Sequence, residues 1–135
     1  MLPSQRTGQW LKRLGFKVGT VERFVKFPGM EHGIRQDLFG FIDLIAMHPK
    51  YGIVAVQATV GAAHAAHVDK IEAEPNALFW TRCGAVIWLV SWRKGGERGK
   101  RKLWTMRIEE FYVAKDGRMF RHEIEQDRLP QGLRA

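Results

Sequence analysis

The stretch from Phe39 to Thr59, FGFIDLIAMHPKYGIVAVQAT, carries the clearest local structural signal in the sequence. It contains two apolar runs that are rich in Ile, Val and Ala, and the short segment HPKYG separates them. Proline and glycine interrupt regular structure and favour a tight turn, whereas the flanking runs are typical of strands. The pattern therefore predicts a β-hairpin.

The loop length of this hairpin determines which side chains share a face of the sheet. A two-residue loop would place Asp43 opposite Val56, which puts Asp43 and Gln57 on opposite faces because side chains alternate along a strand. A three-residue loop at 49–51 places Asp43 opposite Gln57. Gly52 favours the longer loop, since three-residue loops commonly need a glycine in the left-handed conformation at their end.

Outward from the hairpin, the sequence predicts the element order α-β-β-β-α-α-β-β. The expected helices cover residues 3–14, 61–74 and 76–83, and the expected strands cover 16–25, 39–47, 53–59, 85–92 and 103–113. This order predicts an α/β fold with a central mixed β-sheet flanked by helices. A length of 135 residues suits one domain, 1–135, and we expect the tail after about residue 115 to be irregular.

Composition narrows the class of partner. The formal charge of +8 and the pI of about 10.1 favour binding to polyanions, and nucleic acid, an acidic protein and an anionic membrane surface all stay open as partners.

The apolar run 84–90 is far shorter than the roughly 20 residues of a spanning helix, and the amino terminus lacks the apolar centre of a signal peptide. We expect a cytoplasmic protein with no membrane segment. Cys83 is the single cysteine, so an internal disulfide is excluded.

Two polar residues interrupt the apolar runs of the hairpin. Asp43 lies within Phe41–Ala46, where an ionised carboxylate is costly unless it has a partner, a proton or a metal ion. Gln57 lies within Ile53–Ala58, and a buried amide needs hydrogen-bond partners. If they share a face, these side chains mark a polar site.

The residues around this site resemble a known superfamily. Asp43, thirteen further residues and then Gln57-Ala58-Thr59 resemble a variant of the PD-(D/E)XK motif, in which an Asp on one strand and Glu-x-Lys on the next hold Mg²⁺ and the catalytic lysine. The phrases 21–23, 35–43 and 67–71 add to the resemblance. Together they look like Holliday-junction-resolvase-like and phage-type members of the superfamily.

The resemblance implies a restriction-endonuclease-like fold and a site for Mg²⁺ or Mn²⁺. It implies Asp43 as the metal-binding aspartate, Gln57 at the position of the acidic ligand and the Ala58 carbonyl as a backbone ligand. Thr59 stands where the family has lysine. The neutral amide of Gln57 is expected to hold Mg²⁺ more weakly than a carboxylate would, and Thr59 supplies no positive charge.

Other residues are candidates for the missing charges. Lys70, on the helix after the hairpin, is the best replacement for the motif lysine because its long side chain can reach across the sheet. Glu22 either restores a second carboxylate to the site or pairs with Arg23 at the surface. Asp37 is interpreted as a loop residue and kept as a reserve ligand.

A basic segment supports contact with DNA. Residues 93–102 contain six basic residues and one acidic residue, a density that suits phosphate contacts. Trp92 and Trp104 flank the segment and either stack on bases or fill the core. The expected nucleic-acid-binding residues are Arg23, Arg35, Arg93, Lys94, Arg98, Lys100, Arg101 and Lys102.

These features predict a metal-dependent DNA endonuclease or junction-resolving nuclease that acts on branched or single-stranded DNA. The resemblance to resolvases also implies a homodimer. The first alternative is a noncatalytic DNA-binding or assembly protein that kept the fold after Glu-x-Lys changed to Gln-x-Thr. The second is a phage structural or host-interaction module.

Overall fold

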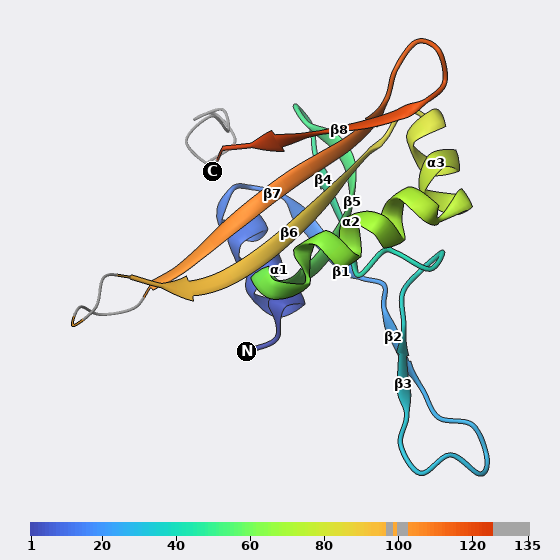
Figure 1. Ribbon diagram of the computed structural model, residues 1–135, viewed down its shortest axis with the longest axis vertical. Helices are drawn as coiled ribbons and strands as arrows, with labels where there is room; N and C mark the ends of the chain where they lie inside the picture. Colours follow the sequence, from blue (N-terminus) through green and yellow to red (C-terminus); the bar gives the residue numbers. More distant parts are fainter. Residues whose placement is uncertain (97–98, 100–102, 126–135) are drawn as a thin grey trace.

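A six-stranded mixed sheet forms the centre of the protein in the computed structural model, which describes residues 1–96, 99 and 103–125 (Figure 1). Its strand order is β1-β4-β5-β6-β7-β8, and only β5 and β6 pair in parallel. The strands are β1 (Lys17–Thr20), β4 (Leu44–His48), β5 (Gly52–Val60), β6 (Val86–Gly95), β7 (Leu103–Val113) and β8 (Met119–Ile124). The expected α/β class with a mixed sheet flanked by helices is confirmed.

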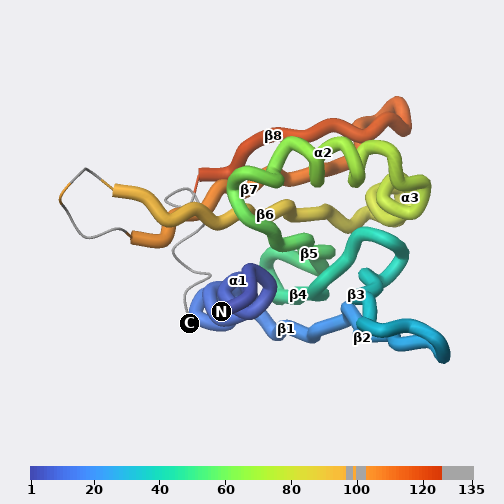
Figure 2. Tube along the Cα trace, turned by 60° about the horizontal axis from the view of Figure 1, so that its bottom comes forward, coloured from blue at the N-terminus to red at the C-terminus, as the bar shows by residue number. Residues whose placement is uncertain are grey.

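Helices cover both faces of this sheet. Figure 2 shows α1 (Pro3–Arg13) on one side of β5 and β6, and α2 (His64–Ala73) and α3 (Pro75–Arg82) on the other. The short 3₁₀ helix η1 (Gly61–Ala63) leads from β5 into α2. Because β5 and β6 are parallel, the chain must cross over between them, and α2 and α3 form this crossover.

Alternation along the strands divides the apolar side chains between two cores. Val54 and Val56 of β5 pack toward α1, whereas Ala55 packs toward α2 and α3. The first core includes Trp10, Leu11, Leu14, Leu44, Trp88 and Val90. The second includes Phe41, Ile42, Val68, Ile71, Ala77, Ile87, Leu89 and Phe111. By the same alternation, Gln57 lies on the side of α2 and α3.

The predicted hairpin and its three-residue loop are confirmed. β4 and β5 pair antiparallel from His48 opposite Gly52 to Leu44 opposite Val56. Gly52 has φ 85°, the left-handed conformation that the loop requires. Asp43 immediately precedes β4, and its N–H donates to the Val56 carbonyl at 2.9 Å.

The element order differs from the predicted one in its first half. The strand expected at 16–25 is divided into β1 and β2 (Arg23–Val25), and β2 pairs with an additional strand, β3 (Ile34–Gln36). The division has a local cause: the N–H groups of Val21 and Glu22 both donate to the Asp43 carbonyl. These two hydrogen bonds close the pairing of β1 with β4, and the chain then leaves the sheet.

The prediction of an irregular tail after about residue 115 is wrong for 119–124. These residues form β8, which pairs with β7. The turn before β8 closes through two hydrogen bonds, from the Ala114 N–H to the Arg118 carbonyl and from the Gly117 N–H to the Ala114 carbonyl, and Gly117 has φ 84°. A turn sequence of Asp and Gly after a strand is a hairpin signal that predicts this pairing.

The structure also bears on membrane association. Within residues 1–96, 99 and 103–125, no helix combines the length and the apolar composition that crossing a bilayer requires.

Candidate active site

A tight loop between β3 and β4 brings two aspartates together. Leu38 and Ile42 form an antiparallel bridge, in which each N–H donates to the carbonyl of the other at 2.9 and 3.0 Å. Asp37 and Asp43 flank this bridge, so they emerge from it side by side. The loop inside the bridge is strained, since Phe39 has φ 55° without being glycine.

Contacts with the α2–α3 junction hold this loop in place. The Asn76 side chain donates to the Phe39 carbonyl at 3.3 Å. Gly40 has φ 83°, and a Cβ at this position would lie 3.1 Å from a carboxylate oxygen of Glu74. A residue other than glycine would therefore disturb both the loop and its contact with the helices.

The backbone of Asp43 links three segments. Its N–H donates to β5 through Val56, and its carbonyl accepts from Val21 and Glu22 at 3.0 and 3.2 Å. Its carboxylate oxygen Oδ2 accepts from the Ala58 N–H at 2.9 Å. These bonds fix the position of the side chain, which is 5% exposed.

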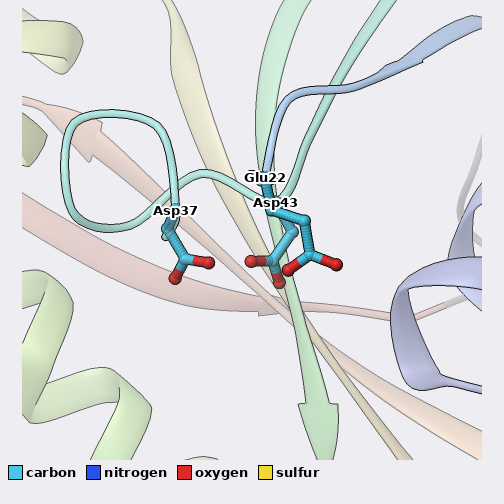
Figure 3. Close-up of side chains that lie close together, drawn as sticks. All are labelled: Glu22, Asp37 and Asp43. Carbon is cyan, nitrogen blue, oxygen red and sulfur yellow. The ribbon is translucent and has the colours of Figure 1, made fainter. Parts of the chain in front are cut away.

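Three carboxylates converge at this point. One oxygen each from Glu22, Asp37 and Asp43 lies within 4.8 Å of the others. Figure 3 shows the three side chains coming from separate segments and extending toward a common space. We call this group the acidic triad.

Gln57 borders the acidic triad and is 1% exposed. Its Nε2 donates to Asp37 Oδ2 at 3.2 Å, whereas its Oε1 is buried and has no hydrogen-bond partner. An unpaired buried oxygen is costly, so this atom is open to a further hydrogen bond or to a ligand. Gln57 thus lies next to the acidic triad through its hydrogen bond to Asp37, and its expected role as a ligand stays a prediction.

Lys70 extends from α2 to the same aspartate. Its Nζ lies 3.1 Å from Asp37 Oδ2 and its side chain is 42% exposed, so the ammonium group is both paired and accessible to solvent. One turn earlier on α2, the His67 Nδ1 is buried without a partner. Burial, followed by the nearby charge of Lys70, lowers the pKa of His67.

The close carboxylates perturb one another. Burial and a hydrogen bond with Asp37 raise the pKa of Asp43 to about 8, and the charges of Asp37 and Glu22 add to this rise. Burial also opposes ionisation of Asp37, but hydrogen bonds with Asp43 and Lys70 outweigh it and lower the pKa of Asp37. At neutral pH the two aspartates therefore share one proton.

The site fits a divalent cation in both charge and ligand type. Carboxylate oxygens are ligands that Mg²⁺ and Mn²⁺ prefer, and the acidic triad supplies three of them, with the Gln57 side chain bonded to Asp37 next to them. A cation in the common space would replace the shared proton and offset the repulsion between the carboxylates.

Ala58 and Thr59, the two residues that follow Gln57 in the predicted motif, lie on β5. The Ala58 N–H donates a hydrogen bond to the Asp43 carboxylate. The expected role of the Ala58 carbonyl as a metal ligand stays a prediction. Thr59 lies on β5 with 7% exposure, and within the described part of the chain no hydrogen bond joins it to the acidic triad. The positive charge next to the acidic triad is that of Lys70, whose Nζ pairs with Asp37.

The basic residues expected to contact DNA fall into separate regions. Arg23 and Arg35 lie on β2 and β3, next to the acidic triad, and Arg35 Nη1 is 4.0 Å from Glu22 Oε1. Arg93 and Lys94 lie at the end of β6, which Figures 1 and 2 show pointing away from β2 and β3. Arg98, Lys100, Arg101 and Lys102 lie outside the described residues.

The flanking tryptophans have different surroundings. Trp92 is 7% exposed and donates to Thr7 Oγ1 at 2.8 Å, so it is a core residue. Trp104 is 44% exposed, and the Arg6 guanidinium lies 4.1 Å from its ring centroid. A cation already covers one face of the Trp104 ring.

Sequence reasoning undervalued Asp37 and missed one polar cluster. Asp37 lies only six residues before Asp43, and this short spacing was a signal that the two side chains could lie close together. The cluster is buried between α2 and the sheet: His64 bonds Ser91 and Glu109, each at 2.7 Å, and Arg121 donates to Glu109 at 2.9 Å. With its partners mutually satisfied, this cluster supports the helix that carries Lys70.

Comparison of the chain with protein-family models, curated proteins and solved structures finds no match.

Proposed function

We propose that the chain is a metal-dependent DNA nuclease with the restriction-endonuclease-like fold of the PD-(D/E)XK superfamily, hydrolysing phosphodiester bonds. The observation that carries the proposal is the convergence of Glu22, Asp37 and Asp43 within 4.8 Å, beside the unpaired buried oxygen of Gln57. The arrangement of the chain supports it, since Asp43 precedes one strand of an antiparallel hairpin and Gln57 lies on the next.

The acidic triad and Gln57 Oε1 would hold Mg²⁺ or Mn²⁺. When bound, the cation supplies Lewis-acid stabilisation of the phosphate charge and lowers the pKa of a water molecule. Asp43 is the central ligand because three backbone segments fix it, while Asp37 is oriented by Gln57 and Lys70.

Lys70 takes the role of the motif lysine in this proposal. Its ammonium group is anchored to Asp37 at 3.1 Å and remains partly exposed, so it can face a phosphate placed at the acidic triad. A positive charge there stabilises the negative charge that develops as the phosphodiester bond breaks. The neutral Thr59 is then free of a catalytic role.

DNA is the proposed substrate, in branched or single-stranded form. The net charge of +8 favours a polyanion, and Arg35 lies beside the acidic triad. Such a substrate needs no base-specific contact for its phosphates to reach the site. We also propose a homodimer, on the resemblance to resolvases alone.

A noncatalytic DNA-binding or assembly protein is the second candidate. The observation that favours it is the pair of substitutions at the motif, Gln57 for the acid and Thr59 for the lysine. In that case the acidic triad would be a structural site that holds β2, the 37–43 loop and β5 together.

Cleavage assays separate the two candidates. Wild type, Asp43→Asn and Asp37→Asn are incubated with four-way-junction, single-stranded and duplex DNA in Mg²⁺, Mn²⁺ or EDTA. Asp69→Asn is the matched control, because Asp69 is an exposed carboxylate on α2 outside the acidic triad.

We expect wild type and Asp69→Asn to cut at least one substrate in the presence of the cation, and both triad variants to lose cleavage. Binding of all three DNA forms without cleavage in either cation would refute the nuclease proposal and support the second candidate. Equal cleavage by wild type and Asp43→Asn would show that another site does the chemistry.

A further inference from the structure

A two-stranded ribbon leaves the sheet next to the acidic triad. It comprises β2, β3 and the loop between them, residues 23–36, and Figure 1 shows it extending away from the body of the protein. We call it the arm. Glu22 immediately precedes the arm and Asp37 immediately follows it, so two members of the acidic triad lie at its base.

The arm exposes large apolar side chains. Phe24 is 68% exposed, Phe27 is 53% exposed and Ile34 is 45% exposed. Several large apolar groups exposed together on a short projecting segment are typical of an interaction site. A two-stranded ribbon has no core of its own in which to bury them.

The ring of Phe24 packs against the backbone of the arm itself. A Cβ added at Gly33 would lie 2.2 Å from the outer edge of this ring, so the ring rests directly against the Gly33 backbone. The register places Phe24 opposite Arg35, with Gly33 diagonal to it on the same face. The absence of a side chain at Gly33 therefore leaves room for the ring against the ribbon.

Cations accompany the aromatic rings. Arg23, Lys26 and Arg35 give the arm three positive charges against the single acid Glu31. Arg35 lies between Phe24 and the acidic triad, since its backbone pairs with Phe24 and its guanidinium lies 4.0 Å from Glu22. Exposed rings interleaved with cations are the combination that binds single-stranded nucleic acid.

We propose that the arm binds unpaired nucleotides adjacent to the scissile phosphate. Phe24 and Phe27 stack on bases, while Arg35 and Lys26 contact phosphates. The inference rests on the proposed nuclease function and deepens it, because it assigns the substrate class as DNA with unpaired bases next to the cut. Duplex DNA presents no free base faces, so it gains nothing from the two rings.

Binding in EDTA tests the arm without cleavage. Fluorescence anisotropy measures the Kd for a labelled 20-nucleotide oligothymidylate and for a 20-base-pair duplex, using wild type and the double variant Phe24→Ala/Phe27→Ala. Phe79→Ala is the control, since Phe79 is 71% exposed on α3 and away from the arm. Thermal unfolding checks that each variant is folded, and sedimentation reports the oligomeric state.

We expect the double variant to bind the oligothymidylate at least about tenfold more weakly than wild type, with an unchanged Kd for the duplex. Phe79→Ala should match wild type on both ligands. Arg35→Met should lower the slope of log K against log salt for the oligothymidylate by about 0.7, the value for one lost phosphate contact on a single strand.

An unchanged oligothymidylate affinity in the folded double variant would overturn the proposal, and so would an equal loss on duplex. A change from dimer to monomer with unchanged DNA affinity would assign the arm to contact with a second copy of the chain. Failure of the nuclease proposal gives another result. In that case the arm still contributes to the affinity for the oligothymidylate, but wild type cuts no DNA in Mg²⁺ or Mn²⁺.

Discussion

Replacing Asp43 by asparagine should stabilise the metal-free protein at neutral pH. Asp43 has a pKa of about 8 in the folded protein because of burial and its hydrogen bond with Asp37, whereas the ordinary value is 3.8. Between these values the folded state holds a proton that the unfolded state has lost. The free energy of unfolding of wild type therefore decreases as the pH rises through this range.

The magnitude follows from the linkage. One proton of difference corresponds to about 1.4 kcal/mol per pH unit, so wild type should lose about 2–3 kcal/mol of stability between pH 5 and pH 7 through Asp43 alone. Asparagine resembles the protonated acid, since its oxygen can accept from the Ala58 N–H and its amide can donate to Asp37. The stability of Asp43→Asn relative to wild type should therefore increase by about 2–3 kcal/mol between pH 5 and pH 7.

Urea denaturation followed by tryptophan fluorescence, in EDTA at pH 5, 6 and 7, measures this difference. The lowered pKa of His67 raises the stability of both proteins with pH in its own range, so the comparison between variants cancels it. The pKa values of Asp37 and Glu109 are lowered, which confines their effects to more acidic solutions. Parallel pH profiles for wild type and Asp43→Asn would refute the raised pKa and the shared proton.

Four further outcomes test the site and its support. Calorimetry should show that the affinity for Mg²⁺ increases by up to about tenfold per pH unit from pH 6 to 8, with a release of protons that Asp43→Asn abolishes. Binding that does not depend on pH would contradict Asp43 as a ligand. Lys70→Met should lower the single-turnover cleavage rate by about 100-fold or more at saturating DNA, and an unchanged rate would remove Lys70 from the mechanism. Gly52→Ala should cost about 1 kcal/mol in urea denaturation because of its left-handed φ, while Gly19→Ala, whose Cβ meets no atom within 4 Å, should show no such left-handed penalty. Glu109→Ala should cost about 3 kcal/mol or more in the same assay, since it leaves the buried cluster without its acid; a loss below about 1 kcal/mol would show that the cluster contributes little.

The central hairpin was predictable because its determinants are local. The apolar runs, the turn and Gly52 lie within one continuous stretch, and the glycine at the loop end selects the three-residue register that the structure has. The first helix was predictable for the same reason: Pro3 begins it, and Gly15, with φ 94°, follows its end.

The arm and β8 were not predicted, because each depends on a partner elsewhere in the chain. The strand expected at 16–25 is interrupted at Val21 and Glu22, whose N–H groups turn to the Asp43 carbonyl about twenty residues further along the chain. No periodicity within 16–25 encodes this partner. β8 depends on β7, because its exposed and charged residues become a strand through pairing with an existing edge.

The hairpin and its register follow from local sequence, and the same register brings Asp43 and Gln57 to one face of the sheet. Alternation and turn chemistry act over a few residues, so they can be read without the rest of the protein. The other groups of the acidic triad and Lys70 come together only through tertiary contacts. Asp37 arrives through the Leu38–Ile42 bridge and Lys70 through the packing of α2. The positions of Asp37 and Lys70 depend on contacts between segments that are distant in the sequence. No short sequence pattern predicts such contacts.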